Sequence, residues 1–394
     1  MFIVGIDIAK RNHEAVIMDD QGRVVQKAFA FANTYEGYNE LIAKLLRITN
    51  IKSQLCLAME ATSHYWLPVY SRLIADGYTV HVINPRQTHA LREMYLRQHK
   101  TDAKDAFIIA EVIRFGRFSD ARIPPEQLLA LRELCRHRFG IVDMASDLKR
   151  KIIALIDQVF PEYDTVFSGI FVDSSVAVLT KYPTPEKLRK ANLTTLTNIL
   201  LKASNGRFGR AKAMEIKLLA ARSFGMPDCG GVYAELISGY LAQLRSIQAQ
   251  VESLEARIKA IMEQINSAIT SITGIGPVLG AVILSEIGDV SQFPSADKLA
   301  AFAGLDPSVK QSGEMQSPSH MSKRGSPYLR RAVWMACTVA VTFDPMFKAY
   351  MEKKTDAGKC YRKAIGHVTK KMISVIYAVL RDNKPYQPIL HDAA

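Results

Sequence analysis

The sequence has few cysteines, and no two of them are close together. There are five, all far apart, and they form no Cys-x-x-Cys motif: Cys56, Cys135, Cys229, Cys337 and Cys360. This spacing gives no sign of a zinc knuckle or of a disulfide framework. We therefore expect reduced thiols, as in a cytosolic protein.

Long apolar runs are also absent. No run reaches the roughly 18 residues that a membrane span needs. The apolar start, "MFIVGIDIAK", carries Asp7 too early for the core of a signal peptide. No basic amphipathic helix dominates the sequence, so a membrane surface is the weaker candidate partner. We expect a soluble intracellular protein.

Positive charge is in excess. Lys and Arg number 51 against 38 Asp and Glu, which gives a formal net charge of +13. A surplus of this size suits an anionic partner such as nucleic acid. The 394 residues, 48% of them hydrophobic, are enough for two or three globular domains.

The N-terminal part reads as a mixed α/β domain. Two strands joined by the "DDQGR" turn follow a buried first strand, and helices then alternate with strands. We expect strands at 2–9, in two parts of 14–33, at 54–60 and at 78–85, and helices at 34–48 and 64–77. Three antiparallel strands followed by this alternation indicate an α/β fold.

Four carboxylates can meet at one edge of that sheet. Asp7 lies in the first strand and Glu60 ends a later, parallel one. The heptamer "KTDAKDA", residues 100–106, places Asp102 and Asp105 on one helical face, where like charges repel. Four acids so close need counter-charge, and hard oxygen ligands suit one or two Mg²⁺ ions. Each acid alone is more often structural, so the prediction depends on their combination.

A strict apolar alternation indicates a coiled coil or a helical hairpin further along. Between 237 and 265 these residues recur every three or four positions over four heptads. The alternative is a long core helix of a monomer, but the polar positions between favour a narrow seam and self-association. The seam consists of Ile237, Tyr240, Leu244, Ile247, Val251, Leu254, Ile258, Ile261 and Ile265.

The segment "ITGIGPVLGAVILSEIGD", residues 272–289, resembles a helix-hairpin-helix motif that binds the DNA backbone. Gly274 and Gly276 permit a tight turn before a helix start, where free N–H groups can meet a phosphate. Glycine turns between packed helices are common, so this signal depends on its surroundings. Two basic stretches, 86–122 and "KRK" near 149–151, also suit a nucleic-acid backbone, without a base-reading motif.

The motifs "GIDIAK", "AMEATSHYW" and "KTDAKDA", with their spacing, resemble the DEDD transposases of insertion sequences related to the Piv-type DNA invertases. The resemblance implies a RuvC-like domain of the ribonuclease H fold at the N-terminus. It puts the acidic tetrad on Asp7, Glu60, Asp102 and Asp105, as ligands of Mg²⁺.

A second group of motifs, in 301–336, resembles the C-terminal transposase domain of the same family. A "GL.P" turn and the pair Ser312–Gly313 precede a basic "KRG...LRR" element that contains Lys323, Arg324, Arg330 and Arg331. The resemblance implies that Ser312 is a nucleophile that joins covalently to a DNA phosphate, with the basic residues binding nucleic acid. Composition alone leaves Ser308, Ser317, Ser319 and Ser322 as competitors for this role.

The resemblance also implies partners. It implies DNA at the element ends and the target, and a guide RNA encoded by the element, in the bacterial or archaeal cytoplasm at the nucleoid. The seam at 237–265 predicts a homo-oligomer, either a dimer or a tetramer. From charge alone, DNA and RNA cannot be told apart.

Three other functions compete. A RuvC-like junction nuclease would use the same tetrad with metal-activated water and no serine. A sugar-kinase or actin-like ATPase shares "GID" but needs glycine-rich phosphate turns that "DIAKRNHE" lacks. A DNA-architectural protein built on the glycine hairpin leaves the tetrad without a role.

We therefore predict an oligomeric DNA transposase with four regions. They are a RuvC-like α/β domain with following helices at 1–159, a helical linker region at 160–236, a coiled coil at 237–266, and a mostly helical transposase domain with the serine at 267–394. Residues 160–236 give no indication of their chemistry.

Overall fold

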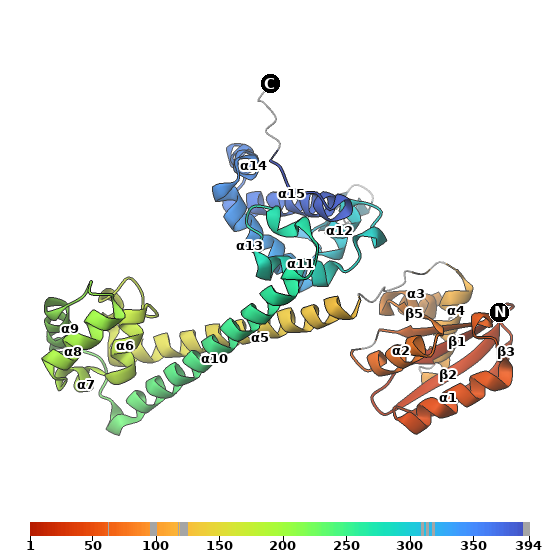
Figure 1. Ribbon diagram of the computed structural model, residues 1–394, viewed down its shortest axis with the longest axis horizontal. Coiled ribbons are helices and arrows are strands. Elements are labelled where there is room, and N and C mark those ends of the chain that lie inside the picture. Colours follow the sequence, from red (N-terminus) through yellow and green to blue (C-terminus); the bar gives the residue numbers. More distant parts are fainter. Residues whose placement is uncertain are drawn as a thin grey trace. The chain divides into compact units, whose positions relative to one another are not determined.

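The computed structural model describes residues 1–61, 63–94, 101–116, 118, 125–308, 311–312, 315–316 and 320–388. The chain divides into two compact units, Met1–Ile123 and Pro124–Ala394 (Figure 1). Within the described residues, no helix is both long and apolar enough to cross a membrane.

The first unit is built on a five-stranded sheet with the order β3-β2-β1-β4-β5. The central strand β1 is antiparallel to β2 and parallel to β4, and β4 is parallel to β5. This confirms the predicted mixed α/β start. The strands are β1 (Phe2–Asp7), β2 (Asn12–Asp19), β3 (Val24–Ala32), β4 (Leu55–Glu60) and β5 (Thr79–Ile83).

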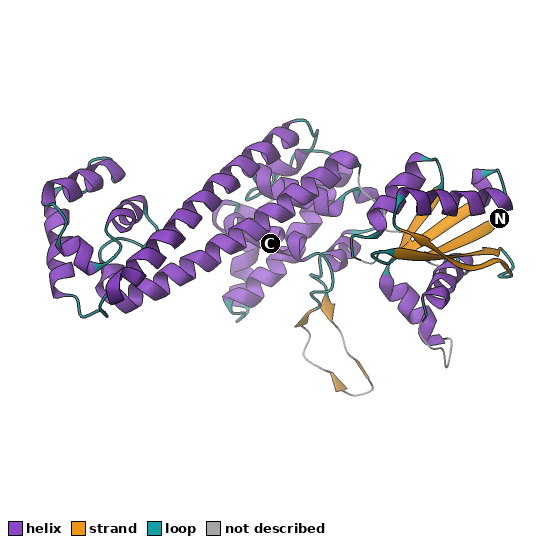
Figure 2. Ribbon diagram, turned by 90° about the horizontal axis from the view of Figure 1, so that it is seen from below, coloured by secondary structure: helices purple, strands orange, loops and turns teal. Residues whose placement is uncertain are grey.

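Helices cover both faces of this sheet (Figure 2). On one face, alternate strand residues such as Val4 and Leu57 pack with α1 (Tyr35–Ile48) and α2 (Trp66–Ala75). On the other face, Ile3 and Ala58 pack with α4 (Asp102–Arg114), next to α3 (Pro85–Met94). Because strand side chains alternate between faces, every second residue of β1 and β4 faces α4.

Two long helices form the spine of the second unit. They are α5 (Glu126–Val159) and α10 (Val232–Glu263), which pack along each other. Arg138 of α5 pairs with Glu255 of α10, and Lys151 lies over the Tyr240 ring, so the helices are antiparallel. The seam predicted at 237–265 therefore has a partner within the chain, α5, in a helical hairpin. Its self-association stays a prediction.

The domain boundary predicted at residue 159 stays a prediction, and α5 lies in the second compact unit. Its first turns pack with the C-terminal helices and its last turns with residues 160–244, all in the second unit. Burial of both ends of α5 in these two clusters explains why the helix belongs to the second unit.

One end of the hairpin carries a group of helices at residues 160–231, called the cap below. Its core contains Tyr163, Leu196 and Ile216, with Ile152 of α5 and Ile237 of α10. Its helices are α6 (Asp173–Lys181), α7 (Pro185–Arg189), α8 (Leu193–Ala203) and α9 (Arg210–Arg222).

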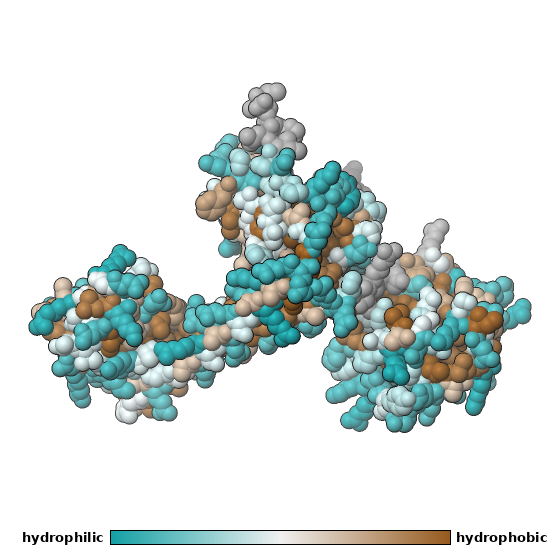
Figure 3. All heavy atoms as spheres, viewed as in Figure 1, coloured by the Kyte–Doolittle hydropathy of each residue, from teal (hydrophilic) through white to brown (hydrophobic). Residues whose placement is uncertain are grey.

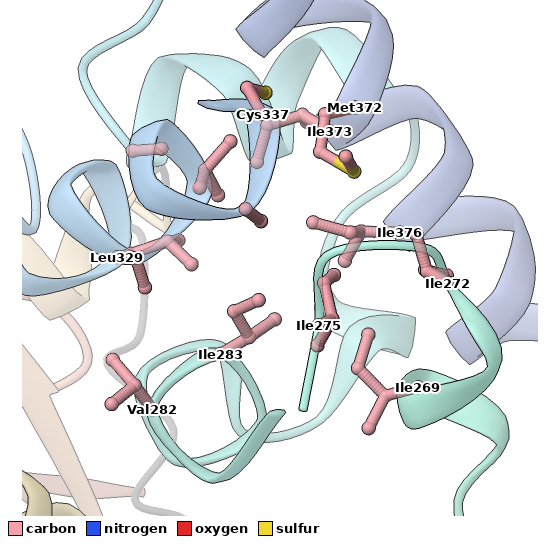
Figure 4. Close-up of a cluster of buried hydrophobic side chains, with 14 of the residues drawn as sticks. Ile269, Ile272, Ile275, Val282, Ile283, Leu329, Cys337, Met372, Ile373 and Ile376 are labelled. Carbon is pink, nitrogen blue, oxygen red and sulfur yellow. The ribbon is translucent and has the colours of Figure 1, made fainter. Parts of the chain in front are cut away.

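The other end of the hairpin enters the C-terminal core. Three isoleucines before α11 pack with Ile283, Met372 and neighbouring apolar side chains (Figure 4). The helices are α11 (Pro277–Ile287), α12 (Ala296–Phe302), α13 (Pro327–Phe343), α14 (Pro345–Asp356) and α15 (Tyr361–Asp382), and the short strands are β6 (Pro307–Ser308), β7 (Gln311–Ser312), β8 (Met315–Gln316) and β9 (His320–Met321).

Candidate functional site

Three carboxylates lie at or near the ends of neighbouring strands, on the face of the sheet that α4 covers. Asp7 ends β1 and lies directly opposite Glu14 of β2 in the antiparallel register. Glu60 ends β4, whose residues pair with β1 up to Ile6–Met59. Strand alternation turns all three acids toward the side of α4, as it does Gly5 and Ala58.

The first turn of α4 brings in the other two acids of the predicted tetrad. A Cβ on Gly5 would lie 2.1 Å from the Ala106 carbonyl oxygen, so only glycine lets α4 cross β1 this closely. Asp102 and Asp105 stand at the start of α4, just before this crossing. Burial and the charge of Asp102 raise the pKa of Glu14, which indicates that these two carboxylates lie close together.

Residues of α3 engage two of these acids. Arg92 Nη2 donates to Asp105 Oδ1 at 2.8 Å, and Asp105 is only 6% exposed. The Thr88 hydroxyl donates to Glu60 Oε2 at 2.7 Å. The site therefore already contains a cation and a hydroxyl that hold two of its carboxylates.

Sequence reasoning missed Glu14, Thr88 and Arg92. Glu14 could have been found by aligning the first hairpin, because the short connection at residues 8–11 fixes which residue of β2 faces Asp7. Nothing in the spacing of Thr88 or Arg92 indicates that α3 folds back on the strand ends.

These acids are of the kind that binds a divalent metal ion. They are hard oxygen donors gathered at one sheet edge. In the described part of the chain, no three His, Cys, Asp or Glu side chains are close enough to hold one ion. The contacts of Arg92 and Thr88 to two of the acids would therefore change if an ion entered.

Ser312 lies in the second unit, on a small strand arrangement between α12 and α13. Strand β6 pairs with β9, and β7 pairs with β8 so that Ser312 is opposite Met315. Figure 2 shows these short strands extending away from the helices. The segment 307–321, called the serine arm below, includes Gly313, Ser317 and Ser319, which lie outside the described residues.

The base of the serine arm is held by two glycine turns that interlock. Lys323 N donates to Gly304 O at 3.1 Å, and Ser326 N donates to Phe302 O at 3.0 Å. A Cβ on Gly325, at φ +152°, would lie 2.0 Å from Phe302 O. The "GL" turn and the "KRG" element are thus held together. Residues 302–306 and 322–326 are called the clamp below.

Ser322 belongs to this clamp as well. Its Oγ is hydrogen-bonded to Asp306 Oδ1, and its N donates to Asp306 O at 2.9 Å. The Ser322 hydroxyl, one of the alternative nucleophiles, therefore holds the clamp together through Asp306.

The four predicted basic residues divide into two pairs. Lys323 and Arg324 are exposed, and their side chains make no hydrogen bond or ion pair with described residues. Arg330 Nη1 donates to Ala303 O at 3.0 Å and to Lys323 O at 3.3 Å. Arg331 forms a two-point pair with Asp143 of α5, which lowers the pKa of that carboxyl. Arg330 and Arg331 therefore hold the fold around the clamp.

A buried acid fixes the start of α13. Glu286 of α11, 4% exposed, pairs with Arg136 Nε of α5 at 2.7 Å. It also accepts a hydrogen bond of 2.7 Å from Ser326 Oγ, the N-cap of α13. This network ties the basic element to α5, and no sequence motif indicated it.

The two glycines of the predicted helix-hairpin-helix differ. Gly274, at φ +89°, lies so close to α13 that a Cβ would be 2.4 Å from Ala336 O. Packing therefore accounts for Gly274. Gly276 is the N-cap of α11, and its Cβ position is open, so the first N–H groups of α11 can meet a ligand there.

Both ends of the chain match transposase families. Residues 4–161 match the DEDD transposase of IS110, described as "Transposase", and residues 266–352 match the "Transposase IS116/IS110/IS902 family". The 44.8 kDa protein of insertion element IS116 from Streptomyces clavuligerus is 26% identical over 98% of this chain and 96% of its own. The 42 kDa protein of IS900 from Mycobacterium paratuberculosis is 27% identical over 99% and 98%.

A DNA-inverting protein is similar along the whole chain too. The pilin gene-inverting protein of Moraxella bovis is 23% identical over 99% of this chain and 98% of its own. The family matches at both ends of the chain agree with the relatives, which are similar over nearly the full length. The chain is a transposase of the IS110/IS116/IS902 family.

Proposed function

We propose that this transposase cuts and rejoins insertion-sequence DNA through a covalent bond between Ser312 and a DNA phosphate. The observation that carries the proposal is the clamp at the base of the serine arm. It fixes both ends of the segment that contains Ser312 and leaves Lys323 and Arg324 exposed beside it.

The chemistry expected of this region is phosphoryl transfer. The Ser312 Oγ loses its proton as it bonds to phosphorus, and the deoxyribose oxygen on the other side leaves and gains a proton. Lys323 and Arg324 would bind the phosphate and neutralise the charge that builds up on it. The ester conserves the bond energy, so a second strand can be joined without ATP.

The tetrad is proposed as the second part of the active site. Asp7, Glu60, Asp102 and Asp105 would hold Mg²⁺ in a domain that we infer to be RuvC-like, and Glu14 stands beside them. A bound Mg²⁺ supplies Lewis-acid stabilisation of the phosphate charge. The acids themselves position the ion, and Arg92 balances their charge when no ion is bound.

The remaining partners are also part of the proposal. A homo-oligomer would form along the α5–α10 hairpin, and an element-encoded guide RNA would select the DNA. We place this activity in the bacterial or archaeal cytoplasm, at the nucleoid.

The decisive experiment looks for a protein–DNA adduct. The purified protein is mixed with element-end DNA and Mg²⁺, with and without co-expressed element RNA, and the products are run on denaturing gels. We expect wild type and Ser308→Ala to give a protein-linked strand. Ser312→Ala should bind the DNA and give none.

The alternative is a metal-dependent junction nuclease that uses water. It predicts free 3′-hydroxyl and 5′-phosphate ends, no linked strand, and full cutting by Ser312→Ala. These products would replace the serine mechanism and leave the tetrad in place.

A further inference from the structure

One stretch of the cap, residues 181–222, is strongly basic. It contains ten Lys or Arg and only two acids, Glu186 and Glu215, a net charge of +8, against +4 for the whole cap at 160–231. Eight of the ten basic side chains are exposed. Figure 3 shows hydrophilic side chains among apolar ones on the face of the cap that it presents. A polyanion is the partner that this composition suits.

A pocket opens in the cap between residues 166–174, which lead into α6, and residues 203–208, at and after the end of α8. Its volume is about 370 Å³, in the range of pockets that hold a small organic group. Phe167 and Phe208 line it, with ring centroids 5.8 Å apart at an interplanar angle of 65°. The pocket therefore has an aromatic wall.

Cations lie over both rings. The Arg207 guanidinium is 5.6 Å from the Phe208 centroid. Lys212 Nζ is 5.7 Å from the Phe167 centroid and 6.0 Å from the Phe208 centroid, and it also pairs with Glu215. Rings flanked by cations form a surface on which a base stacks while its phosphate is held nearby.

The polar lining is mixed rather than purely cationic. Asp173, Asn205 and Ser204 line the pocket, and a carboxylate there opposes a bare anion. Ser174, at the start of α6, also lines the pocket and is only 5% exposed. This combination offers donors and acceptors to the edge of a base, which free phosphate would leave unused.

We propose that the cap binds one unstacked nucleotide of a nucleic-acid strand, with its base in this pocket against Phe208 and its phosphate on Arg207. The strand is either RNA or DNA, because both present the same base and phosphate. The rest of the strand follows the basic surface of α7–α9. This inference goes beyond the proposed function and does not depend on a serine adduct or a metal ion.

The test measures binding of the full chain to labelled single-stranded RNA, single-stranded DNA and duplex DNA by fluorescence anisotropy. EDTA is present, so the outcome is independent of catalysis. Phe208→Leu keeps most of the apolar volume but removes the ring, and we expect it to weaken single-strand binding about 5- to 100-fold. Duplex binding should change less than twofold. A selective loss for RNA or for DNA would identify the strand.

Arg207→Gln tests the phosphate contact, and Arg207 is exposed, so the fold should tolerate it. The slope of log affinity against log salt for single strands should fall by about 0.7, the effect of one lost phosphate contact. The matched controls are Phe343→Leu of α13, 74% exposed, and Arg47→Gln of α1, and both should bind as wild type.

Photocrosslinking gives a second readout. Strands that carry 5-iodouracil should crosslink to a peptide containing Phe167 or Phe208. Wild-type single-strand affinity in both variants, an equal loss for duplex and single strands in Phe208→Leu, or crosslinks only outside the cap would overturn the proposal.

Discussion

Arg92 Nη2 lies 2.8 Å from Asp105 Oδ1, so a cation on α3 holds a buried acid on α4. The Arg92 guanidinium forms an ion pair with a carboxylate that a metal ion would also bind. Arg92 and a divalent ion therefore compete for Asp105 in the proposed site.

This competition predicts the behaviour of Arg92→Met. Without the guanidinium, the Asp105 carboxylate is buried and unpaired, which should cost about 1–3 kcal/mol of folding free energy in EDTA. Added Mg²⁺ should raise the melting temperature of the variant more than that of wild type. Thermal melts with and without Mg²⁺ measure both effects.

Arg72→Met is the control, because it removes an exposed Arg–Asp pair at 3.9 Å on α2. Its cost should be below about 1 kcal/mol, with the same response to Mg²⁺ as wild type. Equal Mg²⁺ shifts in Arg92→Met and wild type would remove Arg92 from the metal site.

Asp102 tests the tetrad with little risk to the fold, since its side chain is exposed. We expect Asp102→Asn to lower the recombination rate at least about 100-fold, as loss of a residue that positions a catalytic group does. Asp20→Asn, an exposed acid in the β2–β3 turn, should recombine normally. Recombinant product is quantified on gels, and full activity of Asp102→Asn would contradict the assignment.

Glu14 gives the site a pH dependence. Its pKa is raised by burial and by Asp102, so the folded chain binds this proton more readily than the unfolded chain. Its ionisation therefore costs stability, and the cost appears as pH rises above the ordinary glutamate range of about 4.

Glu14→Gln should consequently be more stable than wild type at pH 7, by about 0.5 kcal/mol, since it removes a like charge opposite Asp7. The gain should vanish near pH 3.5, where Glu14 is protonated in both states. Urea unfolding at the two pH values measures it. A variant that is less stable at pH 7 would show that Glu14 is held by favourable contacts.

The sheet and two of its acids could be predicted from sequence because their pattern is local. The carboxyl ends of adjacent parallel strands share an edge, which placed Asp7 beside Glu60. The contacts of Arg330 and Arg331 within the fold could not be predicted, because their partners are backbone carbonyls and an acid on α5. Their binding of nucleic acid stays a prediction. A basic motif looks the same whether it binds phosphate or its own chain.

The partner of α10 was missed for a related reason. Its apolar seam is regular, but α5 lies more than 70 residues earlier in the sequence, before the whole cap. Periodicity shows that a helix needs a partner and not which helix supplies it.

The seam nevertheless has a part that α5 covers incompletely. Val251 and Leu254 are only half-buried, whereas Ile237 and Ile258 are buried. We predict that Leu254→Lys lowers the sedimentation mass of a dimeric or larger wild type, because an ammonium group would be buried unpaired.

Gln250→Lys, at an exposed position of the same helix, should keep the wild-type mass. Circular dichroism checks that both variants remain helical. A monomeric wild type, or an unchanged mass in Leu254→Lys, would assign the seam to the hairpin alone.

The clamp predicts a strong effect of a single methyl group. In Gly325→Ala, the new Cβ would meet Phe302 O in a backbone conformation that suits glycine, so we expect a loss of about 2–5 kcal/mol of stability. Gly358→Ala, at φ +77° with open space around it, should cost only about 1–2 kcal/mol. Denaturant unfolding measures the free energy of unfolding of both variants. Equal losses of stability would mean that the backbone of the clamp shifts to accommodate the methyl group.

The length of α5 sets a distance within the second unit. Its 34 residues span about 50 Å at 1.5 Å per residue. That is the length of about 15 base pairs of duplex at 3.4 Å each. One end of α5 enters the core that holds the clamp and the other end enters the cap, so the helix fixes the separation of the two. A strand bound at the proposed cap site would therefore be held more than one turn of duplex away from the phosphate that the proposed Ser312 mechanism attacks.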